Sequence, residues 1–236
     1  MKRTTTSLLL LLTVSAAALG AGEKIIEETF RNFEQKSFSS NGIQADQNGL
    51  LVVRGNRKNN SEGILFRKSF SLPEENSGRR LRWSLTLHSF SDQLHPDKPE
   101  SGFRFFLVPE PLPKHLEFYI LPNAIGITLA PTEDKGCSVS LNLKENSKDG
   151  FGRPLYSCRL KQFPVKVTLE FDATQYRLKF NQESFPVTGN RSGKWDLSSG
   201  IWKNPLHTGG RLINRKDDRR STARLEAFSV ETIDVK

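Results

Sequence analysis

The stretch from Val165 to Phe180, VKVTLEFDATQYRLKF, alternates apolar and polar side chains on both sides of a short turn. A period of two is typical of a β-hairpin. Pairing Phe171 with Tyr176 would put every apolar side chain of both strands on one face and leave the other face polar. In that register Glu170 lies opposite Arg177 as an exposed charge pair, worth only about 0.2 to 1 kcal/mol. The stretch therefore predicts an antiparallel sheet with one buried and one solvated face.

The rest of the chain repeats this pattern as short apolar segments separated by polar, Gly and Pro positions, and helix signals are almost absent. A length of 236 residues is compatible with one all-β domain. We therefore predict a single two-sheet antiparallel β-sandwich over residues 21–236. The predicted core includes Val167, Leu169, Phe171, Leu178, Phe180 and Trp83. The predicted strands are 25–33, 42–46, 50–54, 64–72, 81–90, 102–108, 116–121, 124–130, 138–143, 154–160, 165–171, 176–180 and 223–233.

Residues 1–20 have the pattern of a secretory signal peptide, with a basic start at Lys2 and Arg3, an apolar run from Leu8 to Val14 and a small residue, Gly20, at the cleavage position. The apolar run is shorter than the roughly 20 residues that a transmembrane helix needs. We expect cleavage near Gly20, a secreted or periplasmic protein, and no membrane span.

The formal net charge of the chain is +9. Without Lys2 and Arg3, 33 basic side chains remain against 26 acidic ones, so the basic balance belongs to the predicted domain. Solvated Lys and Arg on loops are one explanation, and attraction to an acidic polysaccharide or an anionic envelope surface is the other. Export argues against a nucleic-acid partner.

Cys137 and Cys158 flank two strand-like segments, SVSLNL and PLYSCRL, joined by the loop KENSKDGFGR. A hairpin centred near Ser147 and Lys148 would bring the two sulfurs opposite each other. Export would then favour a disulfide, worth about 3 kcal/mol for a loop of about 20 residues. Two buried thiols are the alternative, and a metal site is disfavoured because no His or further Cys lies nearby in the sequence.

Several segments together resemble one known family. They are a GLLV-type strand after an Asn-Gly turn, a long strand containing Trp83, the hairpin PVKVTLEFDATQYRLKFN and a closing strand, ARLEAFSVETI. In strand order and pattern, nearly the whole of residues 21–236 is similar to the concanavalin A-like lectin and glucanase superfamily, particularly its laminin-G-like members. The resemblance implies a jelly roll that binds carbohydrate across the concave sheet or on rim loops, with calcium in some members.

An enzyme of this superfamily would need paired carboxylates, because its glycosidases carry E-x-D-x-x-E on one strand. The nearest match here is Glu170-Phe171-Asp172 followed by Gln175, so the third carboxylate is absent. Glu170 and Asp172 are better explained as an exposed strand residue and a turn opener. Hydrolysis with retention needs two carboxyls about 5 to 5.5 Å apart, and the motif supplies no acid partner for Glu170. The alternative is a glycoside hydrolase with an atypical carboxylate arrangement, with Glu117 and Glu170 as its candidates.

A binding platform would follow if the segments at 81–90, 102–108 and 116–121 formed a meander, because their polar faces would then join. Planar side chains stack on sugar rings, and Arg, His and Glu bond sugar hydroxyls. The alternative is that a loop covers Phe106 and Tyr119. Trp195 and Trp202 lie in an irregular segment and are further stacking candidates, unless they plug the edge of the sandwich. The platform residues are Arg82, Thr86, His88, Arg104, Phe106, Glu117 and Tyr119.

Two functions stay open from the sequence. The favoured one is a secreted, non-catalytic module that binds a glycan or polysaccharide, with the positive charge favouring an anionic one. The other is the atypical glycoside hydrolase. No cofactor is expected from the residues themselves, and calcium enters only through the resemblance.

Overall fold

The computed structural model describes part of the chain. The described residues are 22–30, 38–40, 43–45, 48, 50–54, 63–91, 102–112, 123–145, 152–181, 190–198, 200–213 and 222–235. The predicted signal peptide and the candidate site residues Glu117 and Tyr119 lie outside these ranges, so those predictions stay untested. No helix within the described ranges is long and apolar enough to span a bilayer.

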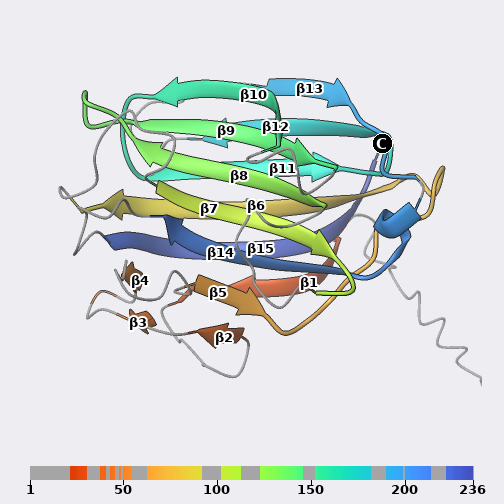
Figure 1. The fold of residues 1–236 in the computed structure, drawn as a ribbon, viewed down its shortest axis with the longest axis horizontal. Coiled ribbons are helices and arrows are strands. Elements are labelled where there is room, and N and C mark those ends of the chain that lie inside the picture. The colour runs from red at the N-terminus through yellow and green to blue at the C-terminus, as the bar shows by residue number, and fades with distance from the viewer. Residues whose placement is uncertain are drawn as a thin grey trace, which may run out of the picture.

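Two antiparallel sheets lie one over the other, and a 3-10 helix, η3 (Gly200–Lys203), is the one helical element described (Figure 1). The first sheet has eight strands in the order β13-β12-β11-β6-β15-β4-β3, and β1 also pairs with β15. These strands are β1 (Glu23–Glu28), β3 (Ile43–Ala45), β4 (Leu51–Arg54), β6 (Arg79–Phe90), β11 (Val165–Phe171), β12 (Gln175–Asn181), β13 (Asn190–Lys194) and β15 (Thr222–Asp234).

The second sheet has seven strands in the order β10-β9-β8-β7-β14-β5-β2. The predicted two-sheet, all-β sandwich is therefore confirmed. The strands of this sheet are β2 (Phe38–Ser40), β5 (Gly63–Phe66), β7 (Gly102–Pro109), β8 (Ala124–Pro131), β9 (Cys137–Lys144), β10 (Arg153–Leu160) and β14 (Leu206–Ile213).

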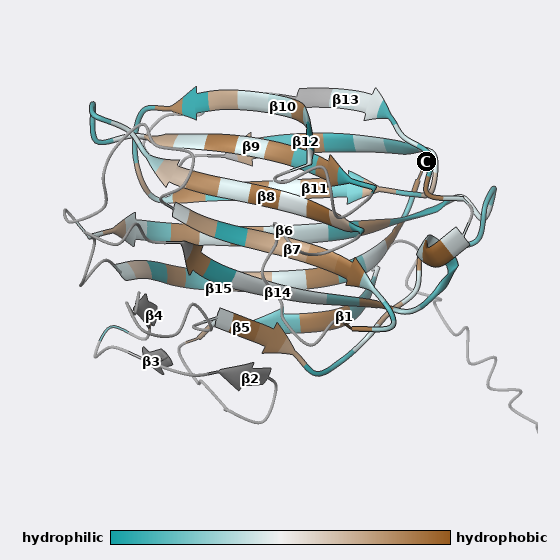
Figure 2. Cartoon of the chain, viewed as in Figure 1, coloured by the Kyte–Doolittle hydropathy of each residue, from teal (hydrophilic) through white to brown (hydrophobic). Residues whose placement is uncertain are grey.

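The core fills the space between the sheets, where alternate side chains of each strand meet; the alternation is visible along β9 in Figure 2. An aromatic cluster lies at its centre. The Phe228 ring stacks on Phe66 at 4.3 Å and on Phe105 at 5.5 Å, and Trp83 meets Phe105 edge-on at 6.1 Å. All six predicted core residues are buried there: Val167, Leu169, Phe171, Leu178, Phe180 and Trp83.

The hairpin formed by β11 and β12 has the predicted register, with Phe171 opposite Tyr176. Asp172 opens its turn as expected, because one oxygen of its carboxylate accepts hydrogen bonds from the backbone N–H groups of Thr174 and Gln175 at 2.8 and 2.9 Å. The indole N–H of Trp195 donates to the Asp172 carbonyl oxygen at 2.8 Å, which ties the turn to the segment after β13. The hairpin is thus fixed at its tip as well as along its strands.

The predicted meander of 81–90 with 102–108 is wrong. β6 pairs with β11 and β15 in the 8-stranded sheet, whereas β7 pairs with β8 and β14 in the 7-stranded sheet. β14 was missed by the sequence prediction because Gly209 and Gly210 interrupt its pattern. A Cβ atom on Gly209 would lie 2.8 Å from the Phe106 ring, so the glycine makes room for an aromatic neighbour on β7.

The predicted disulfide is also wrong, although the hairpin that suggested it exists as β9 and β10. Cys137 lies opposite Leu160, and Cys158 lies opposite Val139, so the two strands are displaced from the expected register. A bulge between Pro154 and Tyr156 contributes to this shift. Both cysteines are thiols, and burial raises the pKa of Cys137 above its ordinary range.

Candidate functional site

The outer face of the 7-stranded sheet is buried at its centre. Phe106 is only 2% exposed and forms a second apolar cluster with Val108 and Ala124, separate from the main core. Arg104, on the same face of β7, is 5% exposed and its Nε donates to the Thr128 hydroxyl at 2.8 Å. Burial lowers the pKa of Arg104 to about 10. The prediction that Arg104 and Phe106 lie on a solvated face is therefore wrong.

The two tryptophans proposed for stacking are also buried. Trp195 lies against the hairpin tip, with its ring 5.5 Å from Phe171 and 4.9 Å from Tyr176. Trp202 is the buried residue of η3 and belongs to the main core. Both rings are packed inside the sandwich, in line with the alternative that they plug its edge. Neither ring offers an open surface on which a sugar could stack.

The outer face of the 8-stranded sheet, by contrast, is polar. One row of side chains crosses β1, β15, β6, β11 and β12 with charges of alternating sign. Cross-strand pairing places its members side by side. We call it the charged row: Lys24, Glu231, Arg82, Glu170 and Arg177.

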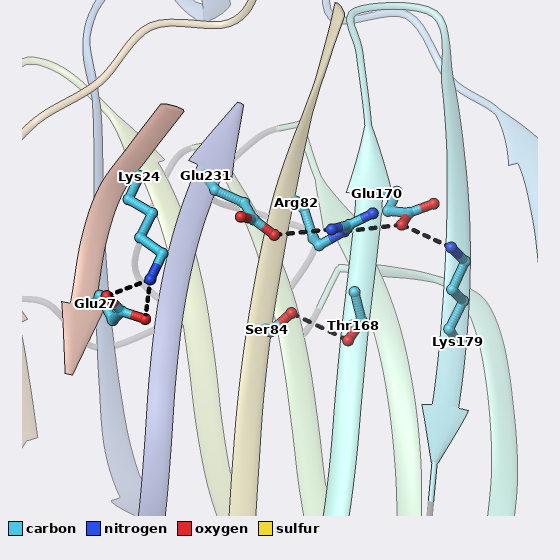
Figure 3. Close-up of polar contacts among 8 residues, drawn as sticks. All are labelled: Lys24, Glu27, Arg82, Ser84, Thr168, Glu170, Lys179 and Glu231. Carbon is cyan, nitrogen blue, oxygen red and sulfur yellow. Dashed lines mark hydrogen bonds and ion pairs between the residues drawn. The ribbon is translucent and has the colours of Figure 1, made fainter. Parts of the chain in front are cut away.

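Arg82 and Glu170 form the centre of the charged row (Figure 3). Arg82 Nε donates to Glu170 at 3.0 Å, and its Nη1 donates to Glu231 at 2.9 Å. Lys179 reaches diagonally from the next row to Glu170 at 2.6 Å. In that next row, the hydroxyls of Ser84 and Thr168 lie 3.0 Å apart. The four charged side chains form one continuous network, and the pair of hydroxyls lies in the row beside it.

Glu170 is the buried member of this network, since only 6% of its side chain is exposed. The predicted register with Arg177 is confirmed, but the predicted exposed pair is wrong, because Glu170 bonds Arg82 and Lys179 instead. Burial is the largest influence on its pKa and acts to raise it, yet hydrogen bonds from Lys179 and Arg82 outweigh burial and lower the pKa. A carboxyl held ionised in this way does not suit a general acid.

The part of this face formed by β11, β12 and β13 carries an excess of positive charge. Glu170 is its one outward carboxylate among the described residues, which leaves a net charge of +3. Within the described part, no carboxylate lies in ion-pair distance of Lys166, Arg177 or Lys194. We call the four cations the basic strip: Lys166, Arg177, Lys179 and Lys194.

The strand register sets the spacing of the basic strip. Along β12, Lys194 lies beside Gln175, Arg177 and Lys179 follow, and Lys166 lies beside Asn181. Each cation therefore occupies its own cross-strand row, and successive rows are about 7 Å apart because two residues of a strand separate them. His88 lies further along the outer side of β6 and is exposed. Sequence analysis missed Lys166 and Lys179, although their places on the polar side of the hairpin were visible, and it missed Lys194, which lies on a strand it did not predict.

A hollow of about 240 Å³ lies at the end of this face, where β12 begins. Its walls are the loop before β6, the turn between β11 and β12, and Val235 near the C-terminus, which is marked in Figure 1. We call it the end hollow. The residues lining it are Glu74, Glu75, Asn76, Ser77, Gly78, Arg79, Arg80, Asp172, Ala173, Thr174, Gln175 and Val235.

The calcium that the resemblance implied does not fit the described residues. No group of three or more His, Cys, Asp or Glu side chains within the described ranges could hold a metal ion. In the end hollow the three carboxylates share the space with Arg79 and Arg80, and Arg80 donates to Asp172 at 2.9 Å. A guanidinium bonded to a candidate ligand opposes a cation there.

No protein-family model and no curated protein matches the chain. Solved structures do resemble it. The acidic lectin of winged bean, complexed with methyl-alpha-D-galactose, aligns with a TM-score of 0.63 at 12% identity, over 89% of this chain and 99% of that one. Lectin I of Ulex europaeus, in complex with the methyl glycoside of alpha-L-fucose, aligns with a TM-score of 0.61 at 12% identity, over 89% and 99% of the two chains.

A third structure comes from outside the plant lectins. The CBM2 module of the evolved Dit protein of Lactobacillus casei BL23 phage J-1 aligns with a TM-score of 0.56 at 10% identity, over 92% of this chain and 98% of that one. At such low identity the likeness concerns the fold. The protein therefore has the concanavalin A-like jelly-roll fold of the legume lectins, as the sequence resemblance predicted.

Proposed function

We propose that the protein is a non-catalytic carbohydrate-binding β-sandwich that holds an anionic glycan on the basic strip. The observation that carries this proposal is the spacing of the strip, with one cation in each of four successive rows along β12. A linear polyanion lying along β12 would meet a positive charge about every 7 Å. The residues involved are Lys166, Arg177, Lys179 and Lys194.

The exposure and the ion pairing of these cations support the same function. Lys166, Arg177 and Lys194 are exposed and have no carboxylate partner within the described part, so their charges are available to a ligand. Lys179 is held in place by Glu170, which limits the side-chain entropy that binding would cost. The Thr168 hydroxyl lies beside the strip, 3.0 Å from that of Ser84, and can exchange hydrogen bonds with sugar hydroxyls.

The structural neighbours support carbohydrate as the ligand class. Two of them are lectins solved with methyl glycosides, and a third is named as a CBM2 module. These names describe those proteins, and the present chain shares their fold at 10 to 12% identity. The proposal includes export of the protein, which rests on the leader pattern of residues 1–20.

A glycan array with matched sulfated and unsulfated ligands tests the proposal. We expect binding to sulfated or uronate-rich chains that weakens as salt rises. The reason is that dissolved ions screen the charges, and the screening length falls to ~8 Å at physiological ionic strength. A triple variant, Lys166→Ala, Arg177→Ala and Lys194→Ala, should bind about threefold to 150-fold more weakly, since each exposed charge contact is worth about 0.2 to 1 kcal/mol.

The matched control removes three exposed lysines from other parts of the surface: Lys68→Ala, Lys161→Ala and Lys203→Ala. It changes the net charge by the same amount. An equal loss of binding in both triple variants would overturn the assignment to the basic strip. Absence of binding by the wild-type protein to every charged and neutral glycan would overturn carbohydrate binding itself.

A further inference from the structure

We propose that the end hollow binds one neutral sugar residue, and that this residue belongs to the same glycan chain whose acidic groups meet the basic strip. The inference rests on the proposed carbohydrate-binding function and adds a second, chemically different subsite. It is carried by the volume of the hollow, by the hydrogen-bonding groups in its walls and by its position at the beginning of β12.

Part of the lining of the end hollow is a set of polar groups joined by hydrogen bonds. The Asp172 carboxylate accepts hydrogen bonds from Arg80 Nε, from the hydroxyl and backbone N–H of Thr174 and from the backbone N–H of Gln175. The Arg80 side chain is 17% exposed, and within the described part Nε makes its one hydrogen bond. The Nη groups of Arg80 and the side-chain amide of Gln175 therefore offer donors to a ligand.

The loop from Glu74 to Gly78 also lines the hollow; a turn bond closes it internally, and a bond to the C-terminal strand holds its second end. The Ser77 backbone N–H donates to the Glu74 carbonyl at 3.1 Å, and the Val235 N–H donates to the Gly78 carbonyl at 2.7 Å. Asn76 adopts a left-handed conformation with φ of 64°, which asparagine tolerates better than most residues. A wall fixed before the ligand arrives reduces the ordering cost of binding.

The balance of charge in the end hollow selects a neutral ligand. Three carboxylates, Glu74, Glu75 and Asp172, face two guanidinium groups, Arg79 and Arg80, which leaves a net charge of −1. An anionic residue would be repelled by the exposed carboxylates, and a metal ion by the guanidinium groups. Mixed donors and acceptors on planar groups suit adjacent hydroxyls of a pyranose, and the volume of about 240 Å³ suits one such residue.

The position of the end hollow connects it to the basic strip. Gln175 lines the hollow and also begins β12, where it pairs with Lys194. Arg177 is two residues further on the same face, about 7 Å away. A glycan running along β12 would therefore place a neutral residue in the hollow and acidic groups on the following residues. The proposed ligand therefore contains a neutral sugar residue followed by acidic ones, unlike a uniformly sulfated polymer.

Backbone amide NMR of the wild-type protein, titrated with neutral methyl glycosides and then with a sulfated oligosaccharide, tests the inference. We expect a neutral glycoside to shift the amide signals of residues 74–78 and 172–175. A double variant, Asn76→Gly and Gln175→Ala, should weaken that binding by about tenfold, the loss of one or two hydrogen bonds. Glycine keeps the left-handed backbone at position 76.

The outcomes separate this inference from the function on which it rests. If sulfated chains bind but no neutral glycoside shifts residues 74–78 or 172–175, the end hollow assignment is overturned and the basic strip stands. The assignment is likewise overturned if the double variant, correctly folded by its amide spectrum, binds the neutral glycoside as well as wild type does. If neither class of sugar binds, both proposals fall.

Discussion

Arg82 and Arg104 occupy corresponding places, each on the outer face of a central strand of its sheet, yet their surroundings differ. The Arg82 side chain is 37% exposed and lies between two carboxylates, whereas Arg104 is 5% exposed, bonds the Thr128 hydroxyl and lies on the same strand face as Phe106. Polar residues at alternate positions of a strand therefore do not show that this face of the sheet is exposed to solvent. The same alternation is solvated on β6 and buried on β7.

The largest expected effect comes from removing the Phe106 ring. If the outer face of the 7-stranded sheet is a second core, Phe106→Ala should lower the free energy of unfolding by about 3 to 5 kcal/mol, because it leaves a cavity. Lys166→Ala on the other face should change it by less than about 0.5 kcal/mol. Urea denaturation of both variants measures the difference. Similar small effects at the two positions would contradict the burial of the outer face of the 7-stranded sheet.

A smaller effect is expected within the charged row. Glu170→Gln keeps the shape of the side chain but leaves Arg82 and Lys179 without their shared carboxylate. We expect a loss of about 1 to 3 kcal/mol, as for hydrogen bonds to charged groups. Denaturation at neutral pH checks this, with Glu231→Gln, which removes only one contact of Arg82, as the milder comparison. A variant as stable as wild type would show that the network is not a stabilising one.

The smallest and most specific expectation concerns pH. The folded-state pKa of Glu170 is lowered, so its contribution is complete above the unfolded value, about 4.3, and is lost as the pH falls through the folded value. The stability difference between wild type and Glu170→Gln should therefore shrink in acid. Denaturation curves of both proteins at a series of pH values between neutral and about 3 measure this. A difference that stays constant down to the acid limit would contradict the assignment.

The alternation of apolar and polar residues predicted those features of the fold that depend on residues close together in the sequence. The hairpin register, the role of Asp172 in the turn and the burial of Leu169 and Trp83 all followed from alternation and turn chemistry. Alternation states which residues share a face, but it carries no information about which sheet the next strand joins. The pairing of β6 with β15 across the sequence was for that reason beyond the prediction.

The candidate site was predicted less well for two physical reasons. The register of β9 and β10, shifted partly by a bulge, places Cys158 opposite Val139, and a bulge leaves no mark in a period-two pattern. Burial of Arg104 and Phe106 depends on what covers a sheet, which their own strand does not encode. The spacing of Lys194, Arg177 and Lys179 was present in the sequence, but it became a strip only when the pairing of β12 with β13 was known.

The position of β15 has a consequence for the timing of folding. This last strand lies between β6 and β4 in the 8-stranded sheet and supplies Glu231 to the charged row. During synthesis β6 is made some 140 residues earlier and must wait for β15, since chains emerge from the ribosome at about 5 to 20 residues per second. The sheet can close only when residues 222–234 are available. A nascent chain of this protein therefore keeps an unpaired β6 edge until β15 has been synthesised, and that edge is open to other strands or to chaperones.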